Sequence, residues 1–213
     1  MEKLKVINLF GGPGTGKSTT RADLFRLMKQ NQLPVEEVTE FAKDVTWDQN
    51  LALFSDQLFV LANQNRRLER LRDKVEWAVS DSPILLGIHY ITPDYLPRTF
   101  KELVFELWDT YDNYNFYIER TKPYVQVGRN QNEDEAKQID ANILEMLDSR
   151  GIPYTKVKCG ETAAAEIYDN LFGKTHPLSV PVEMMKFVID RQGKKVGSLV
   201  KAMVEELFTQ FKK

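Results

Sequence analysis

The chain alternates short apolar segments with longer segments in which apolar residues recur at helical spacing. Five short segments predict buried strands: residues 5–10, 33–40, 75–83, 114–120 and 153–159. Five longer segments predict helices: residues 17–30, 51–72, 98–109, 131–149 and 163–172. This alternation predicts an α/β fold with a mainly parallel sheet that helices cover on both faces.

The pattern changes after Gly173. Residues 174–181 (KTHPLSVP) predict a linker, and residues 182–191 and 194–211 predict two helices separated by a Gln-Gly pair. The second helix carries an apolar stripe, which usually packs on a core but could also bind a partner or nucleic acid. We therefore expect a domain over residues 1–173 and a helical C-terminal extension over residues 174–213.

Composition adds limits on the class of protein. The 213 residues are 42% hydrophobic and 28% charged, which is typical of a soluble globular protein. The single Cys159 excludes an internal disulfide, no apolar stretch is long enough for a membrane span, and the charged N-terminus is unlike a signal peptide. We expect a cytoplasmic protein with no membrane contact. The net charge is −2, with +4 in the extension and −6 elsewhere, so the basic extension is either a solvated surface or a phosphate contact.

Residues 11–18 (GGPGTGKS) match the Walker A pattern G-x-x-x-x-G-K-[ST] between a predicted strand and a predicted helix. Its glycines allow successive N–H groups to converge on phosphate oxygens. In such a loop the lysine neutralises the β- and γ-phosphates and the hydroxyl ligates Mg²⁺, so we predict ATP and Mg²⁺ as cofactors. The residues expected to bind the nucleotide are Gly11, Gly12, Pro13, Gly14, Thr15, Gly16, Lys17, Ser18 and Thr19.

Nucleotide binding alone leaves several classes open. The chain has no N-K-x-D motif, which a GTPase should carry, and no recognisable arginine finger of a hexameric ATPase. Its short elements favour a kinase of a small or compact acceptor. The predicted fold is therefore a P-loop kinase three-layer sandwich, with five strands in the order 2-3-1-4-5.

Two carboxylates lie where predicted strands end, at the sheet edge where ligands bind. Asp81 would orient Mg²⁺ or its waters or accept the acceptor's proton, and Glu40 would contact the acceptor. A hydroxyl acceptor gains about 10²- to 10⁴-fold from such a base, whereas a phosphate acceptor needs none. The pair therefore favours a hydroxyl acceptor. Which of the two is the base stays open, as does a capping role for either.

The helix predicted over residues 51–72 supplies further candidates for acceptor binding: Asp56, Gln57, Gln64 and Arg67. A glutamine amide suits the paired hydrogen bonds of a pyrimidine edge, and an arginine can hold a phosphate bidentately. A solvated helix face is the other interpretation of the arginines.

Residues 120–135 predict a lid. Arg120 and Arg129 flank a stretch that could close over the transferring group and stabilise its charge, although a polar surface loop is the alternative. Gly160, which follows the fifth strand, is expected beside the adenine, and Cys159 is expected to be a packing residue.

Several blocks resemble one family: VTEFAKD (38–44), LANQNRRLERL (61–71), SDSPIL (80–85) and VGRNQNEDEA (127–136). Over residues 5–172 the chain resembles bacteriophage P-loop kinases grouped with thymidylate kinases, in particular the 5-hydroxymethyl-deoxyuridine DNA kinases. The resemblance implies phosphorylation of 5-hydroxymethyluracil in phage DNA, within the host cytoplasm. A base in duplex DNA must be flipped out and needs a cationic approach, which local arginines could supply.

The leading hypothesis is an ATP- and Mg²⁺-dependent kinase of 5-hydroxymethyluracil in DNA. A kinase of free nucleosides or nucleoside monophosphates is one alternative, and a non-catalytic ATP-dependent switch is another. The oligomeric state stays open, a homodimer included.

Overall fold

Five parallel strands form one sheet in the order β2-β3-β1-β4-β5. The computed structural model describes residues 2–91, 97–121, 124–125 and 131–173. The strands are β1 (Lys5–Phe10), β2 (Val35–Val38), β3 (Trp77–Ser80), β4 (Asp112–Glu119) and β5 (Thr155–Lys158). The predicted α/β fold and strand order are confirmed.

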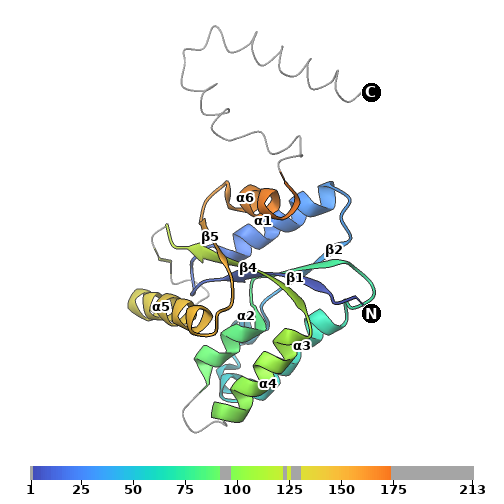
Figure 1. The fold of residues 1–213 in the computed structure, drawn as a ribbon. Helices are drawn as coiled ribbons and strands as arrows, with labels where there is room; N and C mark the ends of the chain where they lie inside the picture. The colour runs from blue at the N-terminus through green and yellow to red at the C-terminus, as the bar shows by residue number, and fades with distance from the viewer. Residues whose placement is uncertain (1, 92–96, 122–123, 126–130, 174–213) are drawn as a thin grey trace, which may run out of the picture. The chain divides into compact units, whose positions relative to one another are not determined.

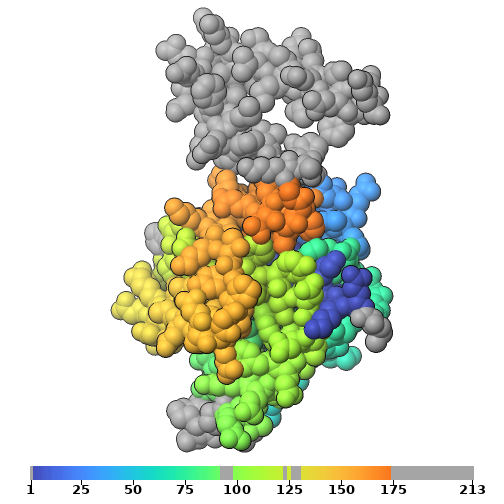
Figure 2. All heavy atoms as spheres, in the orientation of Figure 1, coloured from blue at the N-terminus to red at the C-terminus, as the bar shows by residue number. Residues whose placement is uncertain are grey.

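Helices cover both faces of this sheet, which gives three layers (Figure 1). They are α1 (Lys17–Gln30), α2 (Phe41–Trp47), α3 (Gln57–Glu69), α4 (Pro97–Asp109), α5 (Glu133–Ser149) and α6 (Ala163–Phe172), with 3-10 helices η1 (Leu51–Ser55) and η2 (Ile84–Tyr90). Helices α1 and α6 lie on one face of the sheet, and α3, α4 and α5 lie on the other. The space-filling view in Figure 2, in the same orientation, shows α4, α5 and α6 at the surface that faces the viewer. Within the described ranges, no helix is both long enough and apolar enough to span a bilayer.

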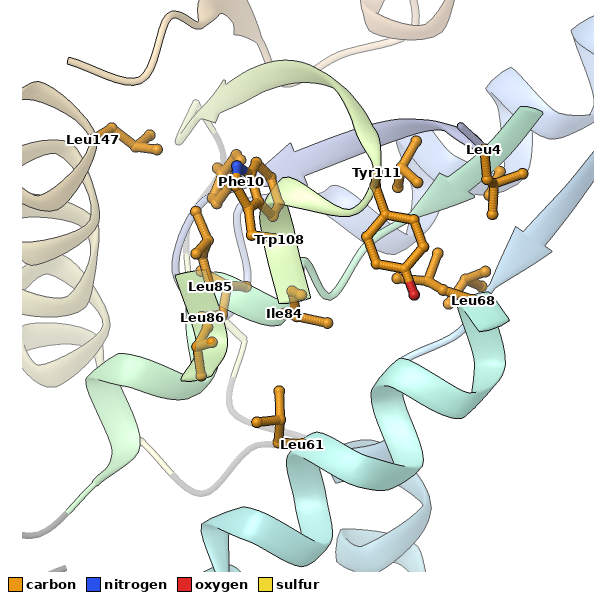
Figure 3. Close-up of a cluster of buried hydrophobic side chains, with 14 of the residues drawn as sticks. Leu4, Phe10, Leu61, Leu68, Ile84, Leu85, Leu86, Trp108, Tyr111 and Leu147 are labelled. Carbon is orange, nitrogen blue, oxygen red and sulfur yellow. The ribbon is translucent and has the colours of Figure 1, made fainter. Parts of the chain in front are cut away.

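The central strand β1 is buried on both faces, which explains its nearly continuous apolar sequence. Phe10 belongs to the large hydrophobic cluster between the sheet and helices α3, α4 and α5. Its ring lies against that of Trp108 of α4, with ring centroids 5.9 Å apart. Leu61 of α3 and Leu147 of α5 converge on the same cluster (Figure 3). Because side chains alternate along a strand, the fully buried Leu9 points to the opposite face.

The buried polar side chain of Asn8 ties β1 to β4. The Asn8 amide donates to Asn113 Oδ1 at 3.0 Å and to Asn115 Oδ1 at 3.2 Å, and only 1% of Asn8 is exposed. Asn115 in turn donates to the carbonyl of Pro153, just before β5. A one-residue slip would leave these buried groups unpaired, so the network favours one register of β1 and β4.

The helix predicted over residues 51–72 is two elements, because the chain breaks at Asp56. This side chain accepts a hydrogen bond from the Phe59 N–H and thereby caps α3. The α5 helix begins two residues later than predicted, at a capping box formed by Asn132 and Glu135. The short elements α2 and η2 were not predicted. The predicted linker and helices of 174–213 lie outside the described residues, so the domain boundary at Gly173 stays a prediction.

The Asn8→Ala substitution tests the buried network. Removing the amide leaves Asn113 and Asn115 without this donor, so we expect the free energy of unfolding to fall by about 1–3 kcal/mol. Urea denaturation followed by circular dichroism measures it. The exposed Asn170→Ala change in α6 is the control and should alter it by less than about 0.5 kcal/mol. Equal losses in both variants would contradict the role of the network.

Candidate active site

The phosphate-binding loop (residues 11–19) runs from the end of β1 into the first turn of α1, and it requires glycine for two reasons. Gly14 and Gly16 have φ angles of 79° and 93°, in the left-handed region that side chains disfavour. A Cβ at Gly16 would also lie 2.4 Å from Cys159 Sγ. Cys159 therefore packs against the loop, in agreement with its predicted packing role.

Lys17 is the first residue of α1, and its ammonium lies within the loop. Nζ donates to the carbonyls of Gly11 at 2.6 Å and Gly12 at 2.9 Å. Burial lowers the pKa of Lys17, and three nearby carboxylates oppose this shift by favouring the charged ammonium: Glu40, Asp81 and Asp140.

Asp81 directly follows β3 and is 4% exposed. Its Oδ2 lies 3.2 Å from Arg21 Nε of α1, and Arg21 also pairs with Glu37 of β2. Its Oδ1 is buried without a hydrogen-bond partner among the described residues. Asp81 is thus held by a fixed arginine, with one oxygen left to accept a bond.

This arrangement fits the predicted Mg²⁺ ligands. Ser18 is exposed at the start of α1, one helical turn before Arg21. No group of three or more potential metal-binding side chains occurs in the described part of the chain. A Mg²⁺ ion on Ser18 would therefore take most ligands from phosphate oxygens and water, as is usual for this ion, with Asp81 available to hold a water.

A cavity of about 420 Å³ extends from the loop to α2, α3 and η2. Lys17, Ser18 and Thr19 line one end, and Glu40 and Gln57 also face the cavity. Aromatic and aliphatic side chains line much of the rest, among them Trp47, Phe54, Leu61, Ile84, Leu86 and Tyr90, and further polar side chains lie between them. A hollow with apolar walls on one side and polar groups on the other is a common form of a small-molecule site.

The two glutamines predicted to bind the acceptor both reach this cavity, but their amides also bond to the backbone. Gln57 donates to the Phe54 carbonyl at 2.8 Å. Gln64 accepts from the Phe41 N–H at 2.9 Å and donates to the Thr39 carbonyl at 3.3 Å. Gln64 therefore fixes both neighbours of Glu40.

Asp56 and Arg67, also predicted to bind the acceptor, are not among the side chains that line the cavity. Asp56 caps α3. Arg67 donates to the Thr39 carbonyl at 3.1 Å, forms an ion pair with Asp44 and lies over the Phe41 ring. Arg67 thus supports the same turn that Gln64 holds.

Arg120, predicted as a lid residue, directly follows β4, and its side chain lies between the phosphate-binding loop and α5. It pairs with Asp140 of α5 at 2.9 Å and donates to the Pro13 carbonyl at 2.8 Å. Asp140 was not predicted, because no sequence pattern separates it from the other acids of α5. Arg129, the second lid arginine, lies outside the described residues.

Gly160, predicted beside adenine, lies after β5 and is not among the cavity-lining residues. A Cβ at Gly160 would have no neighbouring atom within 4 Å, so its surroundings are open. Its contact with adenine stays a prediction.

Comparison with known proteins gives one family and a set of similar folds. Residues 6–164 match the family model described as an AAA domain, and no curated protein matches the chain. The structure of deoxyadenosine kinase from M. mycoides with bound dATP is 14% identical, with 78% of this chain and 98% of that chain covered and a TM-score of 0.50. A second structure of that kinase, with the products dCMP and a flexible dCDP bound, is 15% identical over the same shares, with a TM-score of 0.48. At these identities the likeness concerns the fold.

The Gly12→Ala substitution tests how closely α5 packs on the loop. The added Cβ would lie 2.6 Å from Asp140 Oδ1 and 2.7 Å from the Ala136 carbonyl. We therefore expect a loss of about 1–3 kcal/mol in the free energy of unfolding, because backbone and helix must move apart. Thermal and urea unfolding measure it. Gly160→Ala, which meets open space, is the matched control, and a Gly12→Ala variant as stable as that control would refute the close packing.

Proposed function

Because the chain belongs to the AAA domain family and has a P-loop kinase fold, we propose that it is an ATP-dependent phosphotransferase acting on a hydroxyl of a nucleotide-type acceptor. The observation that carries this proposal is the continuous cavity that joins Lys17 and Ser18 to Glu40 and an apolar compartment. A carboxylate next to a phosphate cradle can take a proton from an attacking hydroxyl, and the adjoining apolar compartment gives room for an acceptor that carries it.

In the proposed reaction ATP binds with its phosphates on the loop, and Lys17 turns from its backbone acceptors toward the phosphate oxygens. The acceptor hydroxyl attacks the γ-phosphorus and forms a new O–P bond, while the bond to the β-phosphate oxygen breaks and releases ADP. Glu40 accepts the hydroxyl proton. Bound Mg²⁺ would neutralise charge on the phosphates.

Glu40 suits the base better than Asp81 does. Glu40 lines the cavity, and its backbone neighbours are fixed by Gln64. Asp81 does not line the cavity, and one of its oxygens pairs with Arg21 while the other has no hydrogen-bond partner among the described residues, so we assign it to the metal waters. The two carboxylates therefore take separate roles in the proposed mechanism.

The leading acceptor, which rests on the sequence motifs, is 5-hydroxymethyluracil within DNA. The base would enter the apolar compartment and bring its hydroxymethyl oxygen toward Glu40. The residues that line the apolar compartment would then contact the flipped base, with the DNA backbone outside.

A free nucleoside is the second candidate, and the charges around the cavity favour it. Among the described lining residues, the cationic side chains are Lys17 and Lys43. Arg67 and Arg72, which could have held DNA or an acceptor phosphate, are paired with Asp44 and Glu69. An uncharged acceptor would need no further cation.

Labelled ATP offered with four acceptors separates these candidates: DNA containing 5-hydroxymethyluracil, plain DNA, free nucleosides and nucleoside monophosphates. We expect label on the modified DNA or on free nucleosides. Label on no acceptor would refute the kinase proposal. Lys17→Ala is the control, and it should abolish transfer to either acceptor because the phosphates lose their principal cation.

The Glu40→Gln substitution tests the proposed base. With the acceptor found in that assay, we expect kcat to fall by about 10²- to 10⁴-fold because the amide cannot take the proton. The affinity for ATP should change little. Asp48→Asn, an exposed change just after α2, is the control. A kcat for Glu40→Gln close to that of the control would assign the proton to another group.

A further inference from the structure

Asp140 makes three contacts that join α5, β4 and the phosphate-binding loop. Its Oδ1 accepts from the Gly12 N–H at 2.6 Å. Its Oδ2 accepts from Arg120 Nε at 3.0 Å and lies 2.9 Å from Arg120 Nη2. The same Nη2 donates to the Pro13 carbonyl at 2.8 Å. The Arg120–Asp140 pair therefore holds two consecutive residues of the loop, one by its N–H and one by its carbonyl.

These contacts differ in kind from those that Lys17 makes. The ammonium of Lys17 bonds to the carbonyls of Gly11 and Gly12, and Thr15 Oγ1 donates to the Gly12 carbonyl at 3.0 Å. When Lys17 moves to a phosphate, its two bonds to the loop are lost. The contacts from the Arg120–Asp140 pair do not involve Lys17, so a movement of Lys17 does not itself break them.

We propose that Asp140 is a positioning residue of the nucleotide site, which holds the loop in its phosphate-binding shape through Gly12 directly and through Arg120 to Pro13. This inference rests on the proposed function only in that the loop must bind a nucleotide. Asp140 itself touches neither phosphate nor acceptor. Its effect passes through the backbone of the loop.

Loss of Arg120 and loss of the Asp140 charge are expected to affect nucleotide binding differently, because the two side chains carry opposite charges. Both side chains are largely buried, with 13% of the Arg120 side chain and 15% of the Asp140 side chain exposed. Without Arg120, the Asp140 carboxylate would stay beside the loop uncompensated and would repel the phosphates of a nucleotide. Without the charge of Asp140, that repulsion disappears.

The experiment measures the dissociation constant of ADP carrying a fluorescent N-methylanthraniloyl group, with the full chain and no acceptor. Asp140→Ala removes the acceptor for the Gly12 N–H, and we expect the dissociation constant to rise about 10- to 100-fold. Asp140→Asn keeps an oxygen that can accept that bond, so its dissociation constant should rise less. Glu145→Gln, an exposed charge change on the same helix, is the control and should bind as the unchanged chain does.

A double variant gives the decisive result. We expect Arg120→Gln to weaken binding, and Arg120→Gln combined with Asp140→Asn to bind more tightly than Arg120→Gln alone, since the uncompensated charge is gone. Melting temperatures without nucleotide show that each variant is folded. If Asp140 served only general stability, the losses of affinity from the two substitutions would add in the double variant, and affinity would not recover.

Two results would overturn the inference: an unchanged dissociation constant in Asp140→Ala, or no recovery in the double variant. Failure of the proposed function is distinguishable from both. In that case the unchanged chain itself would not bind the fluorescent ADP, or it would bind ADP normally yet label no acceptor.

Discussion

The rest of the structure depends on one constraint: at Gly12 and Gly16 the backbone of the phosphate-binding loop lies too close to its neighbours to carry a side chain. Cys159 after β5 abuts Gly16, and α5 abuts Gly12 through Asp140 and a backbone carbonyl. These neighbours come from the carboxyl side of the sheet, where parallel strands bring their ends together. The loop keeps its shape because surrounding elements enclose it, and these elements pack closely because the positions they abut are glycines.

A second turn, at residues 39–41, is supported in the same way. Thr39 and Phe41 are both held by Gln64, and Arg67 adds a bond to Thr39. The carboxylate of Glu40 is thus carried on a backbone that side chains of α3 fix on both sides. Reactive groups in proteins generally need such support, because a small misplacement costs much of their effect.

Sequence patterns predicted the sheet well because each strand is a short apolar run and the loop motif fixes where β1 ends. They did less well on contacts between distant residues. Arg67 and Gln64 carry groups that could bind an acceptor, and nothing in the sequence indicates that these groups bond to the turn before α2. Asp140 lies 128 positions from Gly12, and no local pattern separates it from the other acids of α5. Short elements such as α2 and η2 were missed because they span too few residues for a periodic pattern.

The charge of Lys17 links these features to nucleotide binding. Burial lowers its pKa, whereas Glu40, Asp81 and Asp140 favour the ammonium. Bound phosphates would add further negative charge close to Nζ, so they would raise the pKa again. Protonation of Lys17 and binding of a nucleotide therefore reinforce each other. Arg120 works against the ammonium by its own positive charge, so pairing it with Asp140 keeps two cations close to one small loop at a lower electrostatic cost.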